Sequence, residues 1–232
     1  MVSKRAVGLF ALACLSIGET GRSVVAASIV ERQAPAIAAA SGDPASDRKP
    51  PMTVEVVPRS GSAVFRDATL VHLNGPIDAD APDRLSRALN GVDGQIIVWL
   101  NSPGGNLFAG MQLGRVMRQH GAWTYIIDHR RLRPGECYSA CGLAFLGGIR
   151  RFNDNGARYG VHRASLQGGP GTGSRDLAAD LYAAIESYVR EMGVDVRLLD
   201  LWKKTGPDEI YLLSQQEAED LRVVNGGRNP SE

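Results

Sequence analysis

From residue 68 onward, short apolar runs alternate with longer amphipathic stretches. The most apolar run is QIIVWL (95–100), which lacks polar alternation and therefore predicts a central parallel strand covered on both faces. Further strands are predicted at 52–57, 68–77, 122–128, 157–162 and 210–214. Helices are predicted at 78–90, 106–120, 139–148, 176–192 and after 214. This order predicts a single α/β domain with a mostly parallel sheet.

The first 51 residues have a different pattern. Two basic residues precede a short apolar stretch at 6–18, which is typical of a signal peptide over 1–27 and too short to span a bilayer comfortably. An uncleaved N-terminal anchor, or a lipoprotein-type cleavage site at Cys14, is the alternative. Residues 28–51 are rich in Ala, Pro, Ser and charge, and we interpret them as a flexible linker before a domain at 52–228. We therefore expect an exported, periplasmic protein, either free or membrane-associated through its N-terminal segment.

Composition and charge narrow the functional classes. The formal net charge is +1 and the basic residues are scattered, so a nucleic-acid-binding surface is not expected. The one small basic cluster, Arg130, Arg131 and Arg133, is interpreted as a solvated loop. The sequence has no Walker-type phosphate loop, and no nucleotide or other cofactor is expected.

The chain has three cysteines, of which Cys14 would leave with the signal peptide. Cys137 and Cys141 remain, and an even pair in an exported chain predicts a disulfide. A nucleophilic thiol at Cys137 is the alternative, although an oxidising compartment would cap it. No metal site is expected, because the pair has no further cysteine and no histidine close by in sequence.

Three polar features fall where parallel strands end, which is where ligands bind in such sheets. NSPGG (101–105) is either a tight turn or a source of backbone N–H groups for an oxyanion. Ser139 opens an apolar helix, so it is either an N-cap or a nucleophile in the positive potential of the helix N-terminus. His162 ends a predicted strand, and it is either a general base or an ordinary surface histidine.

Taken together, five stretches resemble, in order, the Clp-type serine peptidases of the ClpP/crotonase superfamily over residues 68–225. The stretches are LVHLNGPI, LNSPGG, CYSACGLAFLGG, YGVH and YLLSQQEAEDLRVV. The resemblance implies repeated ββα units, with Ser139 as nucleophile and His162 as general base. It also implies that the oxyanion is held at Gly104, Gly105 and Ala140.

The third member of the family's catalytic triad does not match. The resemblance places Ile210 at the position of the family's aspartate, and isoleucine cannot orient a histidine. Asp208 is the candidate for this role after a small register shift, and Glu209 is also close. A Ser–His dyad and an inactive site are the alternatives, because losing the orienting carboxylate lowers the rate by about 10⁴ in a triad that depends on it.

Three functions follow from this resemblance. The first is an exported serine peptidase that cleaves peptide or protein substrates, forms homo-oligomers through the helix at 176–192 and needs no metal. The second is an inactive binding or scaffold protein on the same fold. The third is an acyl-thioester enzyme of the crotonase branch, which would need coenzyme A and has no use for the serine–histidine pair.

Overall fold

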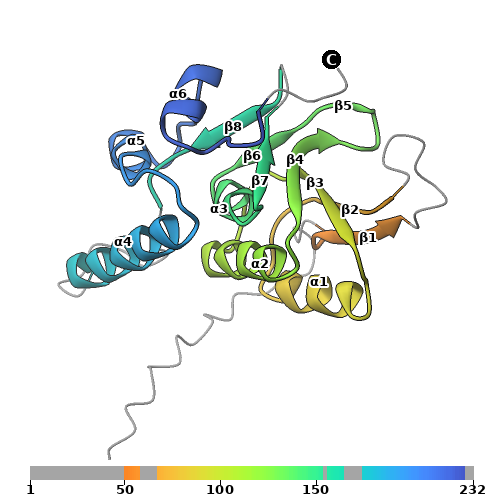
Figure 1. The fold of residues 1–232 in the computed structure, drawn as a ribbon. Helices are drawn as coiled ribbons and strands as arrows, with labels where there is room; N and C mark the ends of the chain where they lie inside the picture. Colours follow the sequence, from red (N-terminus) through yellow and green to blue (C-terminus); the bar gives the residue numbers. More distant parts are fainter. Residues whose placement is uncertain (1–49, 58–66, 154–155, 165–173, 228–232) are drawn as a thin grey trace, which may run out of the picture. The chain divides into compact units, whose positions relative to one another are not determined.

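The computed structural model describes residues 50–57, 67–153, 156–164 and 174–227 (Figure 1). The helices are α1 (Ala81–Leu89), α2 (Leu107–Gln119), α3 (Ala140–Leu146), α4 (Ser174–Glu191), α5 (Leu198–Lys204) and α6 (Gln215–Asp220). The strands are β1 (Thr53–Val57), β2 (Ala68–Asn74), β3 (Gln95–Asn101), β4 (Trp123–Asp128), β5 (Arg133–Pro134), β6 (Glu136–Tyr138), β7 (Arg150–Phe152), β8 (Arg158–Val161) and β9 (Tyr211–Leu212).

The protein is a mixed α/β domain with a mostly parallel main sheet, as predicted. Strand β3 pairs in parallel with β2 and β4, and β7 continues the parallel order beside β4. The edge strand β1 and the short β5 are antiparallel to their neighbours. The predicted central position of β3 is therefore confirmed.

Strands β6, β8 and β9 form a second, three-stranded sheet. Strand β6 pairs in parallel with β8, and β8 pairs antiparallel with β9. An isolated parallel bridge between Ser102 and Cys137 connects the end of β3 to β6. The carboxyl ends of β3, β6 and β8 are thereby held in one region of the molecule.

Side chains alternate between two apolar layers along the central strands. Val98 and Leu100 of β3 join the large core that includes the buried residues of α1, α2 and α3, whereas Ile97 joins a smaller cluster with Leu70 and Tyr125. Successive side chains of a strand point to opposite faces, so the two clusters lie on opposite faces of the sheet. Both faces of β3 are buried, which explains its unbroken apolar sequence.

Helices α2 and α3 pack closely because α2 carries glycine at the contact. A Cβ atom on Gly110 would lie 2.4 Å from the carbonyl oxygen of Ala140, and one on Gly114 would overlap the hydroxyl of Tyr188. That hydroxyl donates a hydrogen bond of 2.7 Å to the carbonyl of Leu143. Helix α4 is thus joined through Tyr188 to the helix that begins beside Ser139.

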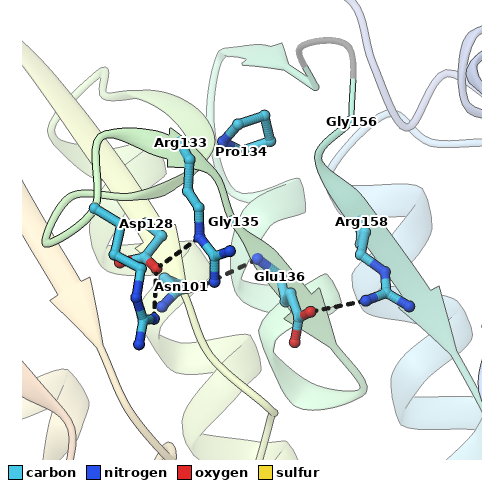
Figure 2. Close-up of a pocket in the computed structure, with 9 residues that line it drawn as sticks. Asn101, Asp128, Arg133, Pro134, Gly135, Glu136, Gly156 and Arg158 are labelled. Carbon is cyan, nitrogen blue, oxygen red and sulfur yellow. Dashed lines mark hydrogen bonds and ion pairs between the residues drawn. The ribbon is translucent and has the colours of Figure 1, made fainter.

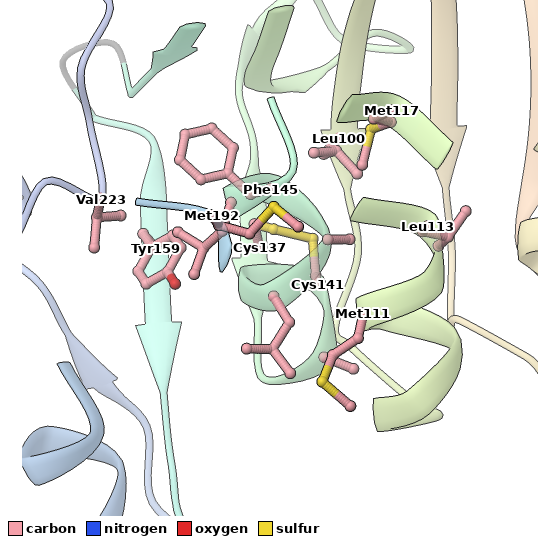
Figure 3. Packing of buried hydrophobic residues seen from close by; sticks show 14 of the residues in the cluster. Leu100, Met111, Leu113, Met117, Cys137, Cys141, Phe145, Tyr159, Met192 and Val223 are labelled. Carbon is pink, nitrogen blue, oxygen red and sulfur yellow. A yellow bond between two sulfur atoms is a disulfide. The ribbon is translucent and has the colours of Figure 1, made fainter. Parts of the chain in front are cut away.

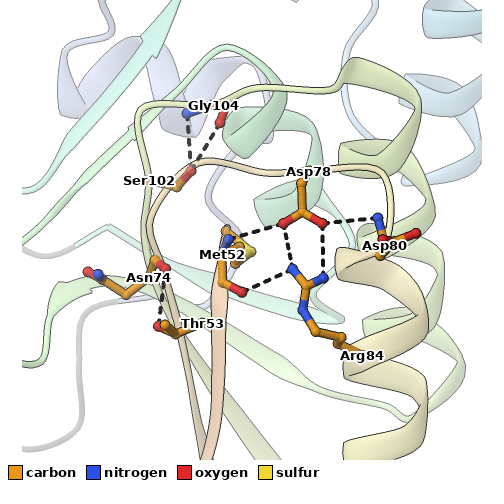
Figure 4. Close-up of polar contacts among 8 residues, drawn as sticks. All are labelled: Met52, Thr53, Asn74, Asp78, Asp80, Arg84, Ser102 and Gly104. Carbon is orange, nitrogen blue, oxygen red and sulfur yellow. Dashed lines mark hydrogen bonds and ion pairs between the residues drawn. The ribbon is translucent and has the colours of Figure 1, made fainter. Parts of the chain in front are cut away.

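An ion pair between Asp78 and Arg84 anchors the backbone just before β1. Asp78 accepts hydrogen bonds from the backbone N–H of Met52 and from the guanidinium of Arg84, which also donates to the carbonyl of Met52 (Figure 4). The hydrogen bonds from Arg84 are the main cause that lowers the pKa of the Asp78 carboxyl. This contact links the residue before β1 to helix α1.

Most predicted elements are present, whereas β5, β6, β7 and α5 were not predicted. Helix α3 is buried throughout, and Ser214 forms the predicted capping box with Glu217 at the start of α6. The predicted signal peptide or anchor at 1–27 and nearly all of the predicted linker at 28–51 lie outside the described residues. In the described ranges no helix is both long and apolar enough to cross a bilayer.

Candidate active site

Ser139 occupies the single-residue turn between β6 and α3. Its backbone has φ +55° and ψ −122°, a conformation that glycine tolerates and that costs another residue about 1–3 kcal/mol. Ser139 stands at the N-cap of α3, yet its side chain makes no capping hydrogen bond. The side chain therefore does not perform the local role that explains most serines at this position.

The backbone around Ser139 is fixed by neighbouring strands. The N–H of Ser139 donates to the carbonyl of Gly160 at 3.0 Å, and the N–H of Tyr138 donates to the carbonyl of Ser102 at 3.1 Å. The carbonyl of Ser139 accepts a hydrogen bond of 2.8 Å from the N–H of Gly142 in α3. These bonds hold the strained turn from both sides.

The predicted disulfide joins Cys137 and Cys141 across this turn (Figure 3). Both cysteines are completely buried in the large core, and Ser139 lies midway between them in sequence. In this oxidised form neither sulfur is available as a nucleophile. The disulfide closes the loop that presents Ser139.

The glycine loop after β3 lies directly against Ser139. Gly104 has φ +96°, and a Cβ atom there would lie 2.9 Å from the Cβ of Ser139 and 2.6 Å from the carbonyl oxygen of Tyr138. Glycine is thus required at this position by its backbone conformation and by the close approach. The structure brings together the loop and the serine that the sequence had singled out separately.

Only part of the predicted oxyanion hole is free to bind a ligand. The N–H of Gly104 donates to the hydroxyl of Ser102 at 3.1 Å (Figure 4). Among the described residues, the N–H groups of Gly105 and Ala140 have no hydrogen-bond acceptor. Two of the three predicted donors therefore have no acceptor within the described part of the chain.

Two polar residues of NSPGG have positioning roles that the sequence did not reveal. The buried Ser102 holds Gly104, as described above. The side chain of Asn101 donates to Asn74 at 2.8 Å and accepts from the backbone N–H of Glu136 at 3.0 Å. The only sequence signal for these roles is polar side chains directly after an apolar strand.

His162 follows β8 and is partly exposed. Its Nδ1 lies 3.0 Å from the carbonyl oxygen of Arg163. A carbonyl only accepts, so in this contact the Nδ1 of His162 is the donor. The parallel register pairs Tyr138 with Gly160, so Ser139 and His162 both lie just beyond the ends of adjacent strands.

No hydrogen bond joins Ser139 to His162 within the described residues. Catalytic hydrogen bonds in a ligand-free site are often long and shorten when substrate binds.

Ile210 lies beside the strand that ends at His162. Strands β8 and β9 pair Gly160 with Leu212 and Val161 with Tyr211, and Ile210 directly precedes the paired residues of β9. A Cβ atom on Gly160 would lie 2.5 Å from the Cγ2 of Ile210, so this side chain packs against β8. The pairing does not continue in the same register, because the N–H of Arg163 donates to the carbonyl of Thr205.

The predicted carboxylates lie beside this position. Asp208 and Glu209 are both exposed, and Glu209 accepts a hydrogen bond from the N–H of Gly206 at 3.3 Å. In the part of the chain that the structure describes, no hydrogen bond or ion pair links either carboxylate to His162. Asp208 therefore stays a prediction as the third catalytic residue.

A polar pocket of about 390 Å³ lies beside the segment that leads to Ser139 (Figure 2). The buried carboxylate of Asp128 accepts hydrogen bonds there from Arg131 at 3.0 Å and Arg133 at 3.4 Å. Burial alone would raise the pKa of Asp128, but the two guanidinium groups outweigh it and the pKa is lowered. The lining residues are Asn101, Asp128, Arg131, Arg133, Pro134, Gly135, Glu136, Gly156 and Arg158.

The predicted basic loop is therefore more than a solvated segment. Arg131 and Arg133 are exposed as expected, yet both are held by one buried carboxylate at the wall of this pocket.

We compared the chain with models of known protein families and with curated protein sequences, and it matches none of them. A function is therefore inferred from the geometry of the site and from the motif resemblance.

Proposed function

We propose that the protein is a serine peptidase on a ClpP/crotonase-type fold, with Ser139 as its nucleophile. The observation that carries this proposal is the backbone of Ser139, which is held in a strained conformation although its side chain caps nothing. Strain of this kind persists where the surrounding structure over-determines it, and it clusters at active sites. A serine that only began a helix would have no reason to adopt it.

The proposed chemistry uses the groups around that serine. The Oγ of Ser139 attacks a peptide carbonyl while Nε2 of His162 accepts its proton. The N–H groups of Gly105 and Ala140 stabilise the oxyanion that forms. His162 then gives the proton to the leaving amine, and a water molecule activated by the same imidazole hydrolyses the acyl-enzyme. In the absence of an orienting carboxylate, the Nδ1 contact with the carbonyl of Arg163 holds the imidazole.

The second candidate is an inactive binding or scaffold protein on the same fold. Ile210 is the observation that favours it, because this side chain packs against the strand that ends at His162 and cannot accept a hydrogen bond. The retained strain at Ser139 favours catalysis instead. Strain without function would be removed by a single change to glycine.

The setting of the proposed enzyme follows from two further features. The disulfide supports an oxidising compartment, and thus the proposed export to the periplasm. Exposed apolar side chains on α2, α4 and the β9 segment support a homo-oligomer; the residues are Phe108, Leu177, Ile210, Tyr211 and Leu212. Neighbouring exposed apolar side chains, such as those of Ile210, Tyr211 and Leu212, are typical of contacts between proteins.

A fluorophosphonate probe tests the proposal directly. We expect it to label Ser139, with the adduct located by peptide mass spectrometry. Labelling of His162→Ala should be slower by about 10²–10⁴, the usual contribution of a general base. Ser214→Ala, which removes a capping serine on α6, is the matched control and should label like the wild type. A folded wild-type protein that is not labelled, or equal labelling of Ser139→Ala, would refute the peptidase proposal.

A further inference from the structure

A second group of chemically active side chains lies away from Ser139, on the face of the main sheet lined by the smaller apolar cluster. Glu55 of β1 is directly opposite His72 of β2, and His72 is in register with Trp99 of β3. His129 follows β4 directly, and its ring stacks on that of His72 with 4.2 Å between centroids. Three strands and the segment after β4 thus converge on one carboxylate and two imidazoles.

The two imidazoles lack the hydrogen bonds that buried polar groups normally have. His72 is 8% exposed, and neither of its ring nitrogens has a hydrogen-bond partner within the described residues. The Nδ1 of His129 is likewise buried without a partner. An unsatisfied buried polar group costs about 1–3 kcal/mol, and the Nδ1 of His72 is the one of these nitrogens that faces the carboxylate of Glu55.

We propose that Glu55, His72 and His129 bind a divalent transition-metal ion of the Zn²⁺ type. The Oε2 of Glu55 lies 3.6 Å from Nδ1 of His72 and 3.7 Å from Nε2 of His129. These separations are too long for hydrogen bonds, yet an ion about 2.0–2.1 Å from each atom fits between them. Two imidazoles and one carboxylate are also donors that such ions prefer.

The remaining distance in the triangle is the one between the two histidine nitrogens. All three ligand atoms lie within 4.8 Å of one another, whereas two ligands of one ion can be at most about 4.2 Å apart. The partly exposed His129 must turn out of its stack on His72 to bring its Nε2 to the ion. His72 is the fixed member, because it is buried and stacked against Trp99 at 5.1 Å.

Coordination by Glu55 on β1 would tie this edge strand to β2 and to the segment after β4.

The site is independent of the proposed peptidase. Val71 and Leu73, on either side of His72, belong to the large core shared with the helices, so His72 itself faces the opposite side of the sheet. The three protein ligands leave one tetrahedral position open for water or another group.

Calorimetric titration of the chelator-treated full-length chain with ZnCl₂ tests the inference. We expect one ion per chain, together with a rise in the melting temperature on binding. His129→Ala should weaken binding more than about 100-fold, because losing even a group that only supports a ligand costs 10–100-fold. Glu55→Gln should also weaken it at least about tenfold, since a neutral amide replaces the charged ligand.

Matched controls come from outside the cluster. His120→Ala, at the C-cap of α2, and Glu186→Gln, on α4, should bind Zn²⁺ like the wild type. Unfolding curves recorded without metal show whether each variant is folded. Absence of stoichiometric binding by the folded wild type, or unchanged binding in both His129→Ala and Glu55→Gln, would overturn the metal site.

Discussion

Replacing Ser139 with glycine should make the protein more stable while removing its proposed nucleophile. A non-glycine residue at φ +55° and ψ −122° stores about 1–3 kcal/mol of backbone strain, which glycine does not. Glycine in turn loses more conformational entropy on folding, by about 0.5–1 kcal/mol. Since the serine side chain makes no capping bond that would be lost, the net gain is about 1 kcal/mol.

Thermal and urea unfolding with the disulfide intact measure this gain. For a chain of this size, 1 kcal/mol corresponds to a rise of about 2–4 °C in melting temperature. Ser139→Ala keeps the strain and should unfold like the wild type, which separates the backbone effect from the loss of the hydroxyl. Both variants should lose the fluorophosphonate reaction.

Ser214→Gly is the opposite control. Ser214 has an ordinary extended backbone and a side chain that caps α6, so glycine there should destabilise by a few tenths of a kcal/mol. If Ser139→Gly is no more stable than Ser139→Ala, the turn is not strained in solution. The main support for the proposed function would then be lost.

Three further predictions test the rest of the site and the fold. Ile210→Asp should place a carboxylate close to the proposed general base and speed fluorophosphonate labelling, whereas Ile210→Asn should help less. No difference between the two would show that charge at this position has no effect. Replacing both Cys137 and Cys141 with alanine should lower the free energy of unfolding, as measured in urea. The loss should be only about 2 kcal/mol, because a disulfide that closes a very short loop stabilises less than one that closes a long loop. Asp78→Asn should destabilise by about 1 kcal/mol at neutral pH through its lost bonds to Arg84. Since the folded pKa of Asp78 is lowered, its contribution is present above pH 3.8 and lost as the pH falls through the folded value, so wild-type and variant melting temperatures should converge in acid.

The sequence predicted those elements whose own pattern of apolar and polar residues shows how they are buried. Strand β3 is apolar throughout because both of its faces are buried, and α3 is apolar because it is enclosed by the core. The strands that were missed have only two or three residues each, and β6 and β7 pair with strands far away in sequence. Strand β6 has three residues and pairs with β8, although α3 and β7 separate the two strands in sequence. No local pattern of residues encodes such a contact.

The same distinction holds for the two sites. The sequence placed Ser139, His162 and the glycine loop at strand ends, because motif order and the parallel-sheet rule are both visible in the chain. It did not reveal the strain at Ser139, which arises from bonds to residues on other strands. It also missed the group formed by Glu55 and His129, whose only link is the register of strands far apart in sequence.

Both the motif alignment and the strand pairing bring Ile210 close to His162. The alignment places isoleucine where the family has a carboxylate, and strands β8 and β9 pair Val161 with Tyr211, the residues just before His162 and just after Ile210. Beyond this pair the register is not continued, because the N–H of Arg163 donates to the carbonyl of Thr205. Unless Asp208 reaches His162, the proposed activity comes from Ser139 and a histidine oriented by a backbone carbonyl. Activity should therefore depend on the rigidity of the loop that the disulfide closes, because no third side chain corrects the position of the imidazole.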